Sequence, residues 1–334
     1  MTDNPILIEI TRGPLMESHH RGAYAVIDDE GNVVTRAGDI DRLIYPRSAL
    51  KLLQALPLIE SGAADHWRLS ETELALACAS HNGEKKHVNT VLNWLQRAGL
   101  SEGHLRCGSQ PPTSREARTQ LIIDNVKPGP VHHNCSGKHT GFLTTAAYLK
   151  EPLPNYLDLD HPVQRRVREA LTETTSDNLD INRVGVDGCG APIFGMPLRG
   201  LALAMARYGT GAGLSAARMK ATARLYSAIV HEPFMIGGSG RWCTKVMKLT
   251  GTQLAIKEGA EGVYCGIVPA KRIGIALKID DGGSRAAEAM MGLLLIRYAE
   301  LDSEASTELE KLSLPSIFNS EGREVGTTRP MEAI

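Results

Sequence analysis

The distribution of strand-like and helix-like segments constrains the fold of this chain most. Short β-rich runs occur near both ends of the sequence, whereas the middle repeats apolar residues at helical spacing. The predicted strands are residues 5–10, 23–27, 33–37, 253–259, 262–269 and 272–280. Strands separated by glycine-rich or charged turns join most simply into one antiparallel sheet, with the helix predicted at 284–301 packed on it.

We therefore predict an α+β fold, in which an antiparallel sheet of N- and C-terminal strands is flanked by helices and accompanied by a mainly helical lobe. The sheet-containing domain is predicted to be discontinuous, with residues 1–46 and 235–334, and the lobe to comprise residues 47–234. The active site is expected in the cleft between them. The turn-rich segment 313–330 is expected to be held loosely.

Capping patterns mark several helix starts in the middle of the chain. The predicted N-caps are Ser70, Thr113 and Asp160. Glutamates follow the first two after three residues, which is the spacing of a capping box. Pro162 follows Asp160 and is expected in the first turn of its helix.

Composition excludes several classes of function. Lys and Arg number 37 against 38 Asp and Glu, so no net field attracts nucleic acid, and no basic run makes a local one. No stretch approaches the roughly 20 apolar residues that span a bilayer, so we expect no membrane partner. The N-terminal segment shows no secretory pattern, which makes the cytoplasm the expected compartment and free thiols or metal ligands the expected state of the cysteines.

Ser48 and Lys51 form the most suggestive pair. Residues at i and i+3 share one face of a helix, and a lysine beside a serine supports acyl transfer when the amine is neutral. The alternative without catalysis is that Ser48 caps the helix and Lys51 is a solvated surface residue. Ser80 follows an apolar run and is either a site residue or an ordinary loop serine. Lys257 lies in a late strand, where it faces solvent or points into a cleft beside the edge.

Two cysteine-containing segments carry side chains that could hold a metal ion. Cys135, Lys138 and His139 surround a helix start, and Asp187 and Cys189 lie in a glycine-rich turn. Two thiolates with nitrogen or oxygen donors suit zinc, but the spacing is not that of a known zinc motif. The alternative is that both cysteines are small buried residues, which is the usual role of a free cysteine.

Several motifs of the chain resemble those of the Rhizobium etli-type L-asparaginases, which are asparaginase II-like proteins. The matching segments are RSALK (47–51), CASHNGEKKH (78–87), LRCGSQPP (105–112), NCSGKHTGFL (134–143), DLDHPVQRRV (158–167), GVDGCGAPIFGMPL (185–198), GRWCTKVM (240–247), KEGAEG (257–262) and ALKIDDG (276–282). They occur in order over most of the chain, and the resemblance weakens after about residue 300.

This resemblance implies a fold similar to that of serine β-lactamases and glutaminases, and a homodimer. It implies two catalytic pairs, Ser48 with Lys51 and Ser80 with Lys257. It also implies one zinc ion per subunit, close to the site but not the source of the nucleophile. The implied zinc ligands are Cys135, Lys138 and Cys189.

The activity that the resemblance implies is hydrolysis of the side-chain amide of L-asparagine to L-aspartate and ammonia. The expected substrate-binding residues are Arg47, Asp187, His81 and Asn134. Arg47 suits the substrate carboxylate, and Asp187 suits its ammonium. Alternatives left open are another acyl-serine amidohydrolase, acting on glutamine or a β-lactam-like amide, a zinc-hydroxide hydrolase, and a zinc-stabilised binding protein.

Overall fold

The computed structural model describes residues 4–331, and these residues form two compact units. Unit 1 comprises residues up to Ala49, then Met196–Gly213, and the chain from Leu249 onward. Unit 2 comprises Leu50–Gly195 and Leu214–Lys248. The division predicted from the sequence, with its active-site cleft, stays a prediction.

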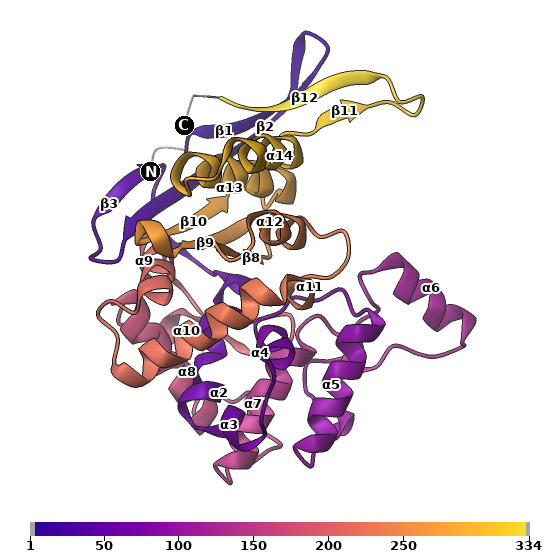
Figure 1. Cartoon of the computed structure of the whole chain (residues 1–334), viewed down its shortest axis with the longest axis vertical. Coiled ribbons are helices and arrows are strands. Elements are labelled where there is room, and N and C mark those ends of the chain that lie inside the picture. The colour runs from indigo at the N-terminus through magenta and orange to yellow at the C-terminus, as the bar shows by residue number, and fades with distance from the viewer. Residues whose placement is uncertain (1–3, 332–334) are drawn as a thin grey trace. The chain divides into compact units, whose positions relative to one another are not determined.

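Unit 1 contains an antiparallel sheet made of strands from both ends of the chain (Figure 1). Its strands in spatial order are β11 (Ser316–Phe318), β12 (Glu324–Pro330), β1 (Ile6–Arg12), β2 (Leu15–Asp28), β10 (Ile273–Ile279), β9 (Val263–Val268) and β8 (Ala255–Gly259), and β3 (Val33–Ala37) also pairs with β2. The α+β fold and the antiparallel sheet are thus confirmed. The expectation that segment 313–330 is loose was wrong, because β12 pairs with β1 and extends the sheet.

Helices cover both faces of this sheet. Gly274 of β10 faces α9 (Leu198–Thr210), since an added Cβ would lie 2.0 Å from the carbonyl oxygen of Ala202. Gly266 of β9 faces α13 (Ser284–Tyr298), where an added Cβ would contact the sulfur of Met291. The remaining elements of unit 1 are β4 (Leu43–Ile44), β7 (Met196–Pro197), the 3-10 turn η5 (Pro269–Lys271) and α14 (Ser303–Ser313).

Unit 2 is mainly helical. Its helices are α1 (Lys51–Gln54), α2 (Leu56–Glu60), α3 (Ala63–His66), α4 (Glu71–Ala77), α5 (Lys85–Arg97), α6 (Arg115–Ile123), α7 (Ser136–Tyr148), α8 (Pro162–Thr175), α10 (Ala216–His231) and α11 (Pro233–Ile236). Its other elements are the hairpin β5 (Val184–Val186) and β6 (Pro192–Phe194), and the 3-10 turns η2 (Glu102–His104), η3 (Pro130–His132) and η4 (Ile181–Arg183). Two elements cross the unit boundaries, η1 (Arg47–Leu50) and α12 (Trp242–Thr250).

Hydrogen bonding explains where the predicted helix starts are right or wrong. Glu73 accepts the backbone N–H of Ser70 at 2.8 Å, which confirms this capping pair. The N-cap of α6 is Ser114 instead of Thr113, because the Ser114 hydroxyl accepts the N–H of Ala117 at 3.2 Å. The N-cap of α8 is likewise one residue later than Asp160, at His161, whose Nδ1 accepts the N–H of Val163. Both shifts are within the usual uncertainty of helix ends.

A close approach between α4 and α7 organises the interior of unit 2. An added Cβ at Gly137 would lie 2.1 Å from the carbonyl oxygen of Leu76, so only glycine allows this backbone contact. The contact brings the first turn of α7 to the end of α4, where the chain continues into Ser80. No helix among residues 4–331 combines the length and the apolar character that crossing a lipid bilayer requires.

Candidate active site

Lys51 and Ser80 meet in the interior of unit 2. Lys51, the first residue of α1, is fully buried, and its Nζ donates to the Ser80 Oγ at 2.9 Å and to the Ala79 carbonyl oxygen at 2.7 Å. The backbone N–H of Ser80 donates to the Ile236 carbonyl oxygen at 2.9 Å, which fixes the serine beside the amine. The pairs that the family resemblance implies, Ser48 with Lys51 and Ser80 with Lys257, stay predictions.

His81 stabilises the loop that carries Ser80 through two hydrogen bonds. Its Nδ1 accepts the backbone N–H of Gly83 at 3.1 Å, so the imidazole proton is on Nε2, which donates to the Ser136 Oγ at 2.9 Å. Burial lowers the pKa of His81 well below its usual value and keeps the ring neutral. Both ring nitrogens are therefore used within the fold, and a contact of His81 with substrate stays a prediction.

Asn134 links the serine loop to the thiols. Its carbonyl oxygen accepts the backbone N–H of His81 at 3.3 Å and lies 3.5 Å from the Nζ of Lys51. Its side-chain oxygen accepts from the Cys135 thiol at 3.1 Å. Asn134 thus places Lys51 and Ser80 close to Cys135 within unit 2.

Lys138 and the two cysteines form a charged cluster in the same unit. All three side chains are buried, and the Nζ of Lys138 donates to the Cys189 Sγ at 3.2 Å. Interaction with Cys135 and the charge of Lys138 lower the pKa of Cys189, which favours its thiolate form. Interaction with Cys189 and burial raise the pKa of Cys135, which keeps the thiol proton that it donates to Asn134. The carboxylate of Asp187 lies 3.9 Å from the Cys189 sulfur.

The donor set of this cluster fits zinc only if the lysine takes part. Within residues 4–331, no three side chains of His, Cys, Asp or Glu converge on a point that could hold a metal ion. Two buried sulfurs and an amine nitrogen leave one tetrahedral position for water, which is the arrangement of an open zinc site. The amine must lose its proton to bind, as any nitrogen ligand must.

In unit 1, Ser48 lies beside the strand that carries Lys257. An added Cβ at Gly259 of β8 would lie 2.4 Å from the Pro46 carbonyl oxygen, so the segment before Ser48 packs on that strand. Arg47 has a positive φ of 54°, a conformation that costs a non-glycine residue about 1 kcal/mol or more. Such strain persists where the surrounding structure requires it, often at functional sites.

Lys257 has an acidic partner that the sequence pattern does not predict. Lys257 is fully buried, and its Nζ lies 3.0 Å from the Glu258 Oε1 and 2.9 Å from the Glu258 carbonyl oxygen. Side chains of successive strand residues point to opposite faces, so the sequence pattern gave no sign of this ion pair. We add Glu258 to the candidate site residues.

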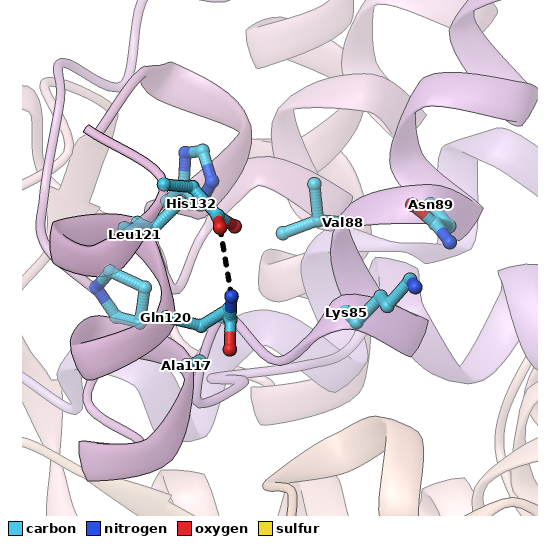
Figure 2. A pocket seen from close by; sticks show the side chains of 10 residues that line it. Lys85, Val88, Asn89, Ala117, Gln120, Leu121 and His132 are labelled. Carbon is cyan, nitrogen blue, oxygen red and sulfur yellow. Dashed lines mark hydrogen bonds between the residues drawn. The ribbon is translucent and has the colours of Figure 1, made fainter. Parts of the chain in front are cut away.

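A cavity of about 330 Å³ lies between α5 and α6, and the residues predicted to form the site are not among those that line it (Figure 2). Val88 and Leu121 form apolar walls, and the Gln120 side-chain amide donates to the Asp124 carboxylate at 2.9 Å. Gly83, which also lines the cavity, is three residues beyond Ser80. The cavity therefore borders the loop of the candidate site without containing its reactive groups.

Comparison with known proteins assigns the chain to a family. A sequence model of the family described as L-asparaginase II matches residues 8–330. The chain therefore belongs to the L-asparaginase II family, which confirms the resemblance found in its motifs and makes it an amidohydrolase. A search among curated proteins found no match.

The structure is similar, at low identity, to several solved structures. One is a β-lactamase from Mycobacterium bovis, with 16% identity, a TM-score of 0.40, and 83% of this chain and 95% of that chain covered. Another is a D-alanine carboxypeptidase from Burkholderia cenocepacia, with 15% identity, a TM-score of 0.40, and coverages of 81% and 93%. The native form of Mglu has 14% identity, a TM-score of 0.43, and coverages of 88% and 64%.

Proposed function

We propose that the protein hydrolyses the side-chain amide of L-asparagine to L-aspartate and ammonia, with a serine nucleophile activated by a lysine. The observation that carries this proposal is the buried Lys51 amine, 2.9 Å from the Ser80 hydroxyl, in a chain of the L-asparaginase II family. Burial of an amine is energetically costly, and buried ionisable groups are common at functional sites. Proton transfer to and from a serine is a function that would account for the fully buried Lys51.

The proposed reaction proceeds through an ester. The serine Oγ attacks the amide carbon while its proton passes to the neutral amine of Lys51, and the resulting ammonium then protonates the leaving nitrogen, which departs as ammonia. Water attacks the ester next, and a lysine again accepts a proton, which returns to the serine oxygen as aspartate forms. We assign the nucleophile to Ser48, with Ser80 and Lys257 relaying protons. Ser80 is the alternative nucleophile, because its Oγ lies 2.9 Å from the Lys51 Nζ.

Zinc is part of this proposal as a bound ion and not as the source of the nucleophile. Cys135, Lys138 and Cys189 are the residues that would hold it. When bound, zinc supplies a fixed positive charge that orients substrate and organises the site. The predicted homodimer and cytoplasmic location stay predictions.

Substitution of Ser48 tests the mechanism. We expect Ser48→Ala to lower kcat for ammonia release from asparagine by about 10²–10⁴-fold, because the ester cannot form. Mass spectrometry of the intact protein during turnover should show the acyl adduct on a peptide containing Ser48. If Ser48→Ala turns over near the wild-type rate and the adduct lies on Ser80, the roles of the two serines are exchanged. An adduct on a cysteine would contradict the serine mechanism.

The choice between asparagine and glutamine is tested by kcat/KM for both substrates with the wild-type protein. A difference of one methylene changes transition-state binding by only about 1–3 kcal/mol, so about 10–200-fold in favour of asparagine is expected. A larger value for glutamine would make the protein a glutaminase of the same mechanism. Binding of either amino acid without ammonia release would favour a binding protein.

Arg47→Gly separates stability from function at the strained position. Glycine adopts a positive φ without cost, so the variant is expected to unfold at slightly higher urea, with a free energy of unfolding up to about 1 kcal/mol larger. Loss of the guanidinium should raise KM for asparagine, because its carboxylate loses a bidentate partner. Urea titration and steady-state kinetics check the two effects. Arg68→Gly is a matched control, since Arg68 also has a positive φ, and here KM should not change.

A further inference from the structure

A glycine-rich segment of unit 2, residues 236–240, is hydrogen-bonded to the loop that carries Ser80. The backbone N–H groups of Ser80 and Asn82 donate to the carbonyl oxygens of Ile236 and Gly237, each at 2.9 Å. Ser80 and Asn82 are both buried, so these bonds are shielded from water. The position of Ser80 therefore depends on where the glycine-rich segment lies.

Glu84, the N-cap residue of α5, holds the glycine-rich segment through its carboxylate. Its Oε1 accepts the backbone N–H of Ser239 at 2.7 Å, and its Oε2 accepts the Ser239 hydroxyl at 2.8 Å. Hydrogen bonds to a carboxylate are about twice as strong as those between neutral groups. The Nδ2 of Asn82 donates to the Ser239 carbonyl oxygen at 3.0 Å. Ser239 is thus held at its N–H, its hydroxyl and its carbonyl oxygen.

Gly238 shows how closely the segment approaches this carboxylate. Its φ is 108°, a conformation that favours glycine. An added Cβ would lie 2.4 Å from the Glu84 Oε1 and 2.9 Å from the Asn82 Cβ. Both the backbone conformation and the available space therefore require glycine at this position. A larger residue would push the segment away from Glu84.

His87 fixes Glu84 relative to α11, the helix that leads into the glycine-rich segment. The Nδ1 of His87 accepts the backbone N–H of Glu84 at 3.2 Å, so the ring proton lies on Nε2, which donates to the Phe234 carbonyl oxygen at 3.1 Å. The rings of His87 and Phe234 are stacked, with their centroids 4.8 Å apart. The start of α5 and α11 are thus joined, and Glu84 reaches the segment from this junction.

We propose that Glu84 is a positioning residue for Ser80. Its carboxylate holds the glycine-rich segment, and the segment holds the serine loop so that the Ser80 Oγ lies 2.9 Å from the Lys51 Nζ. Misplacing a reacting group by about 1 Å can cost about 10²-fold in rate. The consequence for catalysis rests on the proposed function, whereas the positioning of the loop rests on these hydrogen bonds alone.

Hydrogen exchange of the protein without substrate tests the positioning. Glu84→Ala removes the carboxylate, and Gly238→Ala places a methyl group against it without changing the N-cap of α5. In both variants the amides of Ser80 and Asn82 should exchange about tenfold faster or more, while the amides of α8 keep their wild-type rates because unit 2 stays folded. Glu84→Gln keeps an acceptor for the Ser239 N–H and should restore slow exchange. Wild-type exchange at Ser80 and Asn82 in either alanine variant would overturn the proposal.

Steady-state kinetics with asparagine test the consequence for catalysis. Glu84→Ala and Gly238→Ala should lower kcat about 10–100-fold and leave KM within about twofold of the wild type, because they displace the serine loop and keep Arg47 and Asp187. Glu84→Gln should recover most of kcat. Glu232→Gln is the matched control, since its carboxylate accepts from the Thr72 hydroxyl at 2.8 Å, and here kcat should not change.

The two experiments distinguish failure of this inference from failure of the proposed function. Glu84 is half-buried and Ser239 is exposed, so Glu84→Ala removes no core packing. If Glu84 only stabilised the fold, Glu84→Ala would unfold at lower urea but keep the wild-type kcat when folded, and the proposal would be wrong. If the wild type releases no ammonia from asparagine, the proposed function fails, and hydrogen exchange alone decides whether Glu84 positions the loop.

Discussion

Replacing Lys51 by methionine is expected to lower kcat for asparagine hydrolysis by about 10²–10⁴-fold, the usual contribution of a positioned proton acceptor. Methionine has a similar length but cannot take the serine proton. The Ala79 carbonyl oxygen also loses its partner at 2.7 Å, which should lower the free energy of unfolding by about 1–3 kcal/mol. Ammonia release under saturating substrate measures the first effect, and urea unfolding measures the second.

Lys51→Arg distinguishes a proton acceptor from a positive charge. Arginine keeps a cation and several donors at this position but does not lose its proton in proteins, so it should be as inactive as methionine. Lys85→Met, which removes an exposed lysine of the same unit, should leave kcat unchanged. Substantial activity of a correctly folded Lys51→Arg would show that the amine serves through its charge, and the proposed role of Lys51 would be wrong.

Most strands of the sheet could be predicted from the sequence, because the residue types within each segment and the turns beside it indicate a strand. β9 and β10 are short runs rich in β-branched residues, and glycine or charged turns separate them from each other and from β8. The pairing of β12 with β1 could not be predicted in this way. The two strands are more than 300 residues apart, and β12 has a composition typical of a loop, so only tertiary pairing identifies it.

The candidate site was predictable in its residue types but not in its contacts. The i, i+3 spacing suggested Ser48 for Lys51, whereas the structure records a hydrogen bond from Lys51 to Ser80, which depends on how the loop after α4 folds back. Neither helix nor strand periodicity predicts the ion pair of Lys257 with Glu258, because the two residues are adjacent in the chain.

Replacing Cys189 by alanine is expected to produce the largest loss of stability in unit 2. The Nζ of Lys138 is 3.2 Å from this thiolate and is buried, so the variant leaves an ammonium without its counter-charge. Removing one partner of a buried ion pair typically costs about 3–5 kcal/mol. Urea unfolding in the presence of a chelator measures it through tryptophan fluorescence, which reports on unit 2 because Trp67, Trp94 and Trp242 all lie there.

A double-mutant cycle separates this charge effect from simple loss of packing. Lys138→Met should cost less than Cys189→Ala, because the lone thiol can take up a proton and become neutral. The double variant should therefore be more stable than Cys189→Ala alone, since no unpaired ammonium remains buried. Cys107→Ala is the matched control, because it removes a buried thiol whose pKa burial raises to about 12 and which is therefore neutral.

The zinc content of Cys189→Ala tests whether Cys189 is also a zinc ligand. Cys189→Ala removes a proposed ligand, so the purified variant should contain no zinc, and added zinc should not raise its free energy of unfolding. Added zinc should stabilise the wild type and Cys107→Ala alike. If Cys189→Ala costs no more than Cys107→Ala and binds zinc as the wild type does, then Cys189 is neither the partner of Lys138 nor a ligand. A buried lysine beside two thiols would then have to be explained without a metal.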